Sequence, residues 1–350
     1  MSIFSWARPE PIHITHSIPA DQQIYLISDL HLGDGTRSDI FLGKDRELLA
    51  FLDKVREEGA HLVIAGDIVD FHQAWAFERV LSAHAEVLGA MTRLADESGV
   101  TYIWGNHDHD ISLFRGFFHF EICSTLHIGD DIRVSHGYDY DPHIGANLAQ
   151  THTATRVHHL LERLLDTWIR LPLENFYTFE NRLAFWLFHK FALVAYGQEK
   201  LLGAVGLGRL AGGGRDFIQY WAMNQIGDPA CIFENVRRRL HDGPHHTIVT
   251  GHSHLPGCVE VEPGRVYVNT GSWTFGSAQY ARWDGDRFSV QDWVSGKEYT
   301  DQAYRPLLER RYHHMDFLSW WRENYMGWLR FRVGEEGRLP TVIRPPKQSS

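Results

Sequence analysis

Five short motifs of this chain carry Asp, Asn and His side chains, which are types that can bind divalent metals. The motifs are Ser28-Asp29-Leu30-His31, Gly66-Asp67-Ile68-Val69-Asp70, Gly105-Asn106-His107-Asp108, Ser135-His136-Gly137 and Gly251-His252-Ser253-His254. Carboxylate, amide and imidazole ligands suit Mn, Fe or Zn, whereas structural zinc sites favour thiolates, which these motifs lack. One such motif arises by chance in many chains, but all five together predict a metal site.

Each motif follows a short apolar run that predicts a buried strand. The five runs cover residues 24–27, 61–64, 100–104, 132–134 and 247–249. Between the first three runs, apolar residues recur at helical spacing, as at Leu48, Leu52 and Val55. The pattern predicts a β-α-β-α-β unit with parallel strands, which places the motifs at the carboxyl ends of the strands, where α/β sheets bind ligands.

The spacing within the motifs is compatible with shared metal binding. Residues i and i+2 of an extended segment face one side, so Asp29 and His31 could bind one ion, and His252 and His254 could face the same cluster. Asp67 could bridge two cations with its two oxygens. The alternative is that Asp29 and Asp67 cap helices that follow them, which would leave the paired histidines unexplained.

In full and in order, the motifs resemble those of the calcineurin-like metallophosphoesterases: D-x-H, G-D-x-x-D, G-N-H-D/E, a lone H and G-H-x-H. A further similar element is Val268-Asn269-Thr270-Gly271-Ser272. The resemblance covers roughly residues 22–140 and 245–292. It implies an α/β fold, a four-layer αββα sandwich in which helices flank two β-sheets, here with a helical cap insertion.

The resemblance also implies two divalent metal ions, Mn first and Fe or Zn as alternatives. The implied ligands are Asp29, His31 and His254 for one ion, Asn106, His136 and His252 for the other, and Asp67 between them. Two such ions, roughly 3.5–4 Å apart, would generate a shared hydroxide that attacks phosphorus. The implied activity is hydrolysis of phosphoester or pyrophosphate bonds.

Two further residues are assigned catalytic roles by the same resemblance. His107 would stabilise or protonate the leaving oxygen instead of binding metal, because imidazole titrates near neutral pH. Asp70 would orient His107, although a plain helix N-cap is the alternative for this carboxylate. After His136, Asp139 and Asp141 could line the site or accept a hydrogen bond from a ligand, but a solvated turn before Pro142 is the favoured interpretation.

The motifs divide the chain into a discontinuous core, at 20–144 and 245–295, and three other segments. Residues 145–244 predict a helical cap over the metal site, 296–337 an aromatic-rich helical extension, and 338–350 a disordered tail. A cap in this position is similar to that of the UDP-2,3-diacylglucosamine hydrolases, whose caps hold acyl chains. This chain differs from them in carrying His107 where they typically have Arg, and its insertion is longer.

Aromatic residues in 176–196 and 317–331 leave the substrate open between two classes. They favour an amphiphilic substrate, such as a lipid-linked pyrophosphate, with peripheral membrane contact. They could instead form the core of the cap and pack the tail against it or into a dimer. The alternatives are then a soluble phosphodiesterase or phosphomonoesterase for nucleotides or phosphoproteins, or a degenerate scaffold without activity.

Composition narrows the remaining possibilities. The formal net charge of −10 over 350 residues disfavours a nucleic-acid partner. The three cysteines are too few and scattered for a disulfide framework and fit a reducing compartment. No signal peptide pattern and no apolar run of about 18–20 residues is visible, so we expect a cytoplasmic protein.

Overall fold

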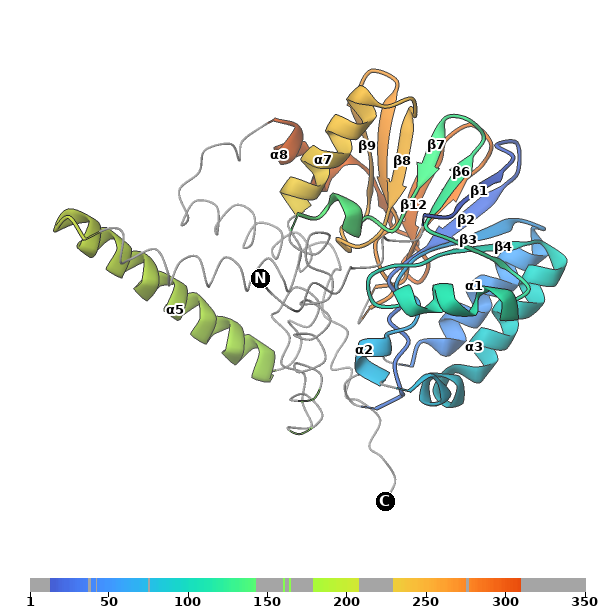
Figure 1. Cartoon of the computed structure of the whole chain (residues 1–350), viewed down its shortest axis with the longest axis horizontal. Coiled ribbons are helices and arrows are strands. Elements are labelled where there is room, and N and C mark those ends of the chain that lie inside the picture. Colours follow the sequence, from blue (N-terminus) through green and yellow to red (C-terminus); the bar gives the residue numbers. More distant parts are fainter. Residues whose placement is uncertain are drawn as a thin grey trace, which may run out of the picture.

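The computed structural model describes residues 13–36, 39–41, 43–74, 76–142, 160, 164, 179–207, 229–274 and 277–309. These residues form two mixed β-sheets with helices packed against them (Figure 1). The expected α/β class is therefore confirmed. The predictions for 317–331 and 338–350 lie outside the described residues, as does much of 145–244.

The larger sheet has seven strands in the order β13-β12-β11-β2-β3-β4-β5. Its parallel half comprises β2 (Ile24–Ile27), β3 (His61–Ala65), β4 (Val100–Ile103) and β5 (Glu121–Cys123). Its antiparallel half comprises β11 (Gln279–Trp283), β12 (Phe288–Asp292) and β13 (Glu298–Tyr299). The helices α1 (Asp45–Glu57), α2 (Phe71–Ala74) and α3 (Phe77–Glu97) connect the first parallel strands, which confirms the predicted β-α-β-α-β unit.

The smaller sheet has six strands in the order β1-β6-β7-β8-β10-β9. They are β1 (Thr15–Ile18), β6 (Thr125–Ile128), β7 (Ile132–Val134), β8 (Thr247–Thr250), β10 (Arg265–Asn269) and β9 (Gly257–Glu262). Although more than 100 residues separate β7 from β8, they pair in parallel, with Val134 opposite Val249. Their carboxyl ends, which lead to His136 and His252, therefore lie side by side.

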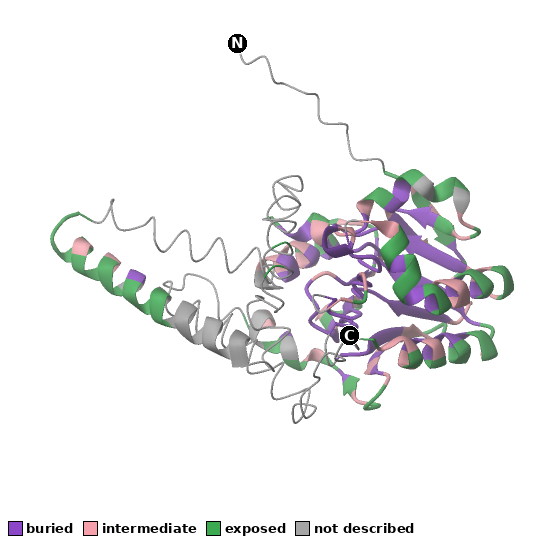
Figure 2. Cartoon of the chain, turned by 90° about the horizontal axis from the view of Figure 1, so that it is seen from below, coloured by how far each residue is buried: buried purple, intermediate pink, exposed green. Residues whose placement is uncertain are grey.

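The apolar core has two layers. One lies between the sheets, where Leu26 and Val63 of the larger sheet belong to the same cluster as Val134 and Val249 of the smaller one. The other lies between the larger sheet and helices α1 and α3, and Figure 2 shows the strands as the most buried part of the molecule. Helix α7 (Pro229–Asp242) contacts β8 and β10 of the smaller sheet.

Several elements lie near the expected domain boundaries. The sheets include β1 and β13, outside the ranges 20–144 and 245–295, and α7, from within 145–244, contacts the smaller sheet. Short turns complete the described fold: η1 (His109–Phe117), η2 (Tyr138–Tyr140), η3 (Asp301–Ala303) and α8 (Arg305–Leu308). The division into domains stays a prediction.

Helix α5 (Phe179–Ala204) extends away from both sheets in Figures 1 and 2. Apolar side chains of this helix are exposed from Phe191 onward: Phe191 is 52% exposed, Val194 58% and Leu201 68%. None of the helices in the described ranges is both long enough and apolar enough to cross a membrane.

A buried histidine of α3, His84, contacts two carboxylates that follow β2 in the sequence. His84 lies at a point where α3 departs from helical geometry, with φ −126° and ψ 30°. Its Nδ1 is 2.7 Å from Asp45 Oδ1 and its Nε2 is 3.1 Å from Asp39 Oδ2. Burial lowers the pKa of His84, but the hydrogen bonds to Asp39 and Asp45 outweigh it and raise this pKa to about 9.

We predict that this pair of contacts makes stability depend on pH on the alkaline side. A raised pKa means that the stabilisation is complete below pH 6.5, the ordinary histidine pKa, and is lost as the pH rises through about 9. Between pH 6.5 and about 9, the free energy of unfolding, measured by urea denaturation, should fall in both proteins. The fall should be about 1–3 kcal/mol larger in the wild type than in His84→Gln. His119→Gln is the control, because His119 pairs with Asp96 on the surface. Equal pH dependence of His84→Gln and the wild type would refute the assignment.

Candidate metal centre

The loops that follow β2 and β3 stay paired beyond the ends of these strands. Asp29 N donates to Gly66 O at 2.9 Å, and His31 N donates to Asp67 O at 3.0 Å. A parallel bridge between Leu32 and Val69 closes the pairing. Asp29 and Asp67 are therefore held side by side at the carboxyl edge of the sheet, as the sequence predicted. Among the described residues, no helix begins directly after Asp29 or Asp67, which excludes the interpretation of these two residues as helix caps.

The backbone is strained at this edge. In the described part of the chain, the non-glycine residues with positive φ are Asp29, His31, Asp67, His252 and His254, with φ between 50° and 63°. All five are predicted metal ligands. Each such residue costs about 1–3 kcal/mol where the side chain disfavours the left-handed region, and strain of this kind gathers at functional sites.

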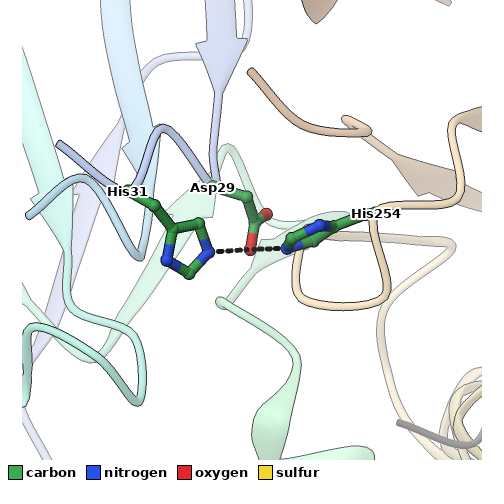
Figure 3. Close-up of side chains that lie close together, drawn as sticks. All are labelled: Asp29, His31 and His254. Carbon is green, nitrogen blue, oxygen red and sulfur yellow. Dashed lines mark hydrogen bonds and ion pairs between the residues drawn. The ribbon is translucent and has the colours of Figure 1, made fainter. Parts of the chain in front are cut away.

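The first group of possible ligands consists of Asp29, His31 and His254, which come from two different sheets (Figure 3). Asp29 Oδ1 lies 3.0 Å from His254 Nε2 and 3.9 Å from His31 Nε2. All three residues are buried. The structure thus brings together the three residues that the family resemblance assigned to one metal.

The second group consists of Asp67, His136 and His252, with Asn106 beside them. His136 Nε2 lies 3.2 Å from Asp67 Oδ2 and 3.2 Å from Asn106 Oδ1, while its Nδ1 donates to Ala65 O at 2.8 Å. Asp67 Oδ2 is also 3.8 Å from His31 Nε2. Asp67 therefore lies between the two groups, where a bridging carboxylate is expected.

Two features of the structure show that these residues fit metal ions. His31 Nε2 is buried and has no hydrogen-bond partner in the described part of the structure, although it lies 3.9 Å from an oxygen of Asp29 and 3.8 Å from one of Asp67. A Cβ at Gly105 would lie 2.1 Å from Asp67 Oδ1, so only glycine allows this approach. A cation between these donors would give the imidazole nitrogen the partner that it lacks.

The electrostatics of the site also call for positive charge. Burial by itself would raise the pKa of Asp67, but the His136 and His107 rings hold that pKa well below its ordinary value. Burial lowers the pKa of His136, yet Asp67 and Asp29 raise it to about 10. Two buried carboxylates so close together need cations, which protons on histidine or bound metal ions can supply.

A third group joins His31, Asp70 and His107. Asp70 Oδ1 is 3.1 Å from His107 Nδ1, and Asp70 Oδ2 is 3.3 Å from His31 Nδ1. Asp70 also caps α2, because its Oδ1 accepts hydrogen bonds from the backbone N of His72 and Gln73. The two interpretations of Asp70 are thus compatible: the carboxylate caps a helix and contacts both histidines.

Two further carboxylates have structural roles: Asp108, which the sequence interpretation missed, and Asp141, for which it favoured a solvated turn. Asp108 accepts hydrogen bonds from Gly105 N, Ile68 N and Tyr102 OH, and so ties the third motif to the second. Asp141 is buried and lies 3.1 Å from His252 Nε2, so the solvated turn favoured from the sequence is wrong at this residue. The contact is the alternative weighed from the sequence, a hydrogen bond accepted from a predicted ligand. The position of Asp141 directly before Pro142 had favoured the turn. Asp139 is exposed.

Known proteins similar to this chain are found among solved structures. No protein-family model matches the chain, and no curated protein matches it. Solved structures that match include a dimetal phosphatase from Danio rerio, with 16% identity, 78% of this chain and 96% of that chain covered, and a TM-score of 0.37. A predicted phosphoesterase from Streptococcus pneumoniae has 12% identity, 77% and 88% coverage and a TM-score of 0.31. A cold-active protein-tyrosine phosphatase of a psychrophilic Shewanella has 14% identity, 81% coverage of both chains and a TM-score of 0.31. These TM-scores are too low to decide the function.

Proposed function

We propose that this protein is a hydrolase of phosphoester or pyrophosphate bonds that depends on two divalent metal ions. The observation that carries the proposal is the convergence of seven predicted ligands into two groups with Asp67 between them. We assign Asp29, His31 and His254 to one ion and Asn106, His136 and His252 to the other. Mn is the first candidate, and Fe or Zn also suits these oxygen and nitrogen donors.

When bound, two divalent ions supply Lewis acidity toward phosphoryl oxygens and a water that ionises near neutral pH. The chain's own residues prepare the site for them. Asp67 and Asp29 provide negative charge in a buried position, and the loop pairing after β2 and β3 fixes where that charge lies. The left-handed turns direct the side chains of successive loops toward the same point.

His107 is placed to act on the leaving group. Its ring is partly exposed, whereas the ligand histidines His31 and His136 are buried. Its Nδ1 contacts Asp70 Oδ1, and we assign to the ring the transfer of a proton to the departing oxygen. Asp70 fixes the tautomer of His107 and, through His31, connects it to the first ligand group.

We further propose a four-layer αββα core and an amphiphilic substrate, such as a UDP-2,3-diacylglucosamine-like lipid pyrophosphate. The contacts of α1 and α3 with one sheet and of α7 with the other support the layer order. The exposed apolar side chains of α5 support the substrate class, because large exposed apolar surfaces mark sites of interaction. The second candidate, a soluble phosphodiesterase or phosphomonoesterase, would not need them.

The central prediction concerns the residue between the two ligand groups. Purified protein should hydrolyse an aryl phosphomonoester or phosphodiester with Mn²⁺ present and should lose this activity with a chelator. Asp67→Ala should lower kcat by at least about 10²–10³-fold and reduce bound metal, measured by elemental analysis, because it removes the shared carboxylate. Asp96→Ala, on the surface, is the control. Full metal-dependent turnover in Asp67→Ala would contradict the proposal.

A separate prediction distinguishes His107 from the ligands. His107→Ala should keep two metal ions per chain while kcat falls by about 10²–10⁴-fold, because only proton transfer is lost. The effect should shrink for substrates whose leaving group departs without a proton, such as nitrophenolate. His119→Ala serves as the control for histidine loss. Release of one ion in His107→Ala would show that this histidine is a ligand.

The substrate class can be tested at α5. Replacing Phe191, Val194 and Leu201 together by Ser should reduce binding to liposomes and slow hydrolysis of acylated substrates, while rates on soluble substrates stay unchanged. The control replaces Leu113 and Val294 by Ser. These side chains are also exposed, at 70% and 66%, but they lie outside α5, in the ranges 20–144 and 245–295. If the α5 variant and the wild type bind liposomes equally weakly and both favour soluble nucleotide diesters, the amphiphilic substrate is refuted. The protein is then a phosphodiesterase for soluble substrates.

A further inference from the structure

His252, one of the proposed ligands, contacts a buried carboxylate, that of Asp141. His252 Nε2 lies 3.1 Å from Asp141 Oδ2, and the two side chains are 6% and 0% exposed. The backbone N of His252 donates to Asp29 Oδ2 at 3.0 Å, and the ring packs edge-on against His136, with 5.2 Å between ring centroids. The ring of His252 is thus held by Asp141 and His136, and its backbone by Asp29.

The carboxylate determines which ring nitrogen remains for a metal. A carboxylate is an acceptor, so the proton of the neutral His252 ring belongs on Nε2, where it is donated to Asp141. Nδ1 then carries the lone pair that a metal ion needs. We propose that Asp141 is a positioning residue that fixes the tautomer and ring orientation of His252 as a ligand of the second ion. This inference rests on the proposed two-metal function and adds a residue to it.

Asp141 is itself held by the turn that precedes it. Its backbone N donates to Tyr138 O at 3.1 Å, closing η2, and η2 begins after Gly137, whose φ of 117° only glycine adopts readily. Tyr140 O accepts a hydrogen bond of 2.9 Å from Asn235 Nδ2 of α7. The same turn therefore connects the second ligand group to α7.

The test compares a buried and an exposed carboxylate in the full-length protein. Mn²⁺ is titrated into metal-stripped wild type, Asp141→Asn and Asp131→Asn, and each binding step is resolved by calorimetry. Asp141→Asn should weaken one of the two sites by about 10–100-fold and leave the other near its wild-type affinity. Asp131→Asn, which changes a carboxylate that is 68% exposed and pairs with His246, should match the wild type at both sites.

A second measurement needs no metal. In the metal-stripped protein, ¹⁵N shifts of the His252 ring should report a proton on Nε2 in the wild type and a mixture of tautomers in Asp141→Asn. Signals are assigned by their loss in His252→Gln. Unchanged affinities in Asp141→Asn, or equal weakening of both sites together with a lowered Tm, would overturn the positioning role. A wild type that binds no Mn²⁺ would instead overturn the proposed function itself.

Discussion

The structure depends above all on keeping two buried carboxylates, Asp29 and Asp67, side by side. Burying one unpaired charge is costly, and placing a second next to it adds repulsion. The backbone adds a cost of its own, since both residues and three of the histidines around them have positive φ. Backbone hydrogen bonds between the loops after β2 and β3 and the imidazoles of His136 and His254 offset these costs.

The site belongs to neither sheet alone. Asp29, His31, Asp67 and Asn106 follow strands of the larger sheet, whereas His136, His252 and His254 follow strands of the smaller one. The apolar cluster between the sheets sets how far apart the two sets of loops lie. Positioning of the ligands is therefore a consequence of core packing, and close approach at Gly66 and Gly105 lets the loops come near enough to share donors.

Much of this could be predicted from the sequence, because short apolar runs that end in Gly, Asp or Asn locate buried strands and their loops. The runs at 24–27, 61–64 and 132–134 match β2, β3 and β7 closely. The partner of a single polar side chain could not be predicted in this way. The position of Asp141 shortly after His136 allowed a contact with a ligand, but it did not identify His252, 111 residues away, as the partner. Nothing near His84 in the sequence indicates its contacts with Asp39 and Asp45. Contacts of this kind arise from packing between distant segments.

Anomalous diffraction from crystals of the full-length protein grown with Mn²⁺ tests the central claim most directly. The account predicts two manganese peaks, roughly 3.5–4 Å apart, with the Asp67 carboxylate between them. One ion should contact Asp29, His31 and His254, and the other Asn106, His136 and His252. A single peak, no peak, or peaks away from Asp67 would contradict the account.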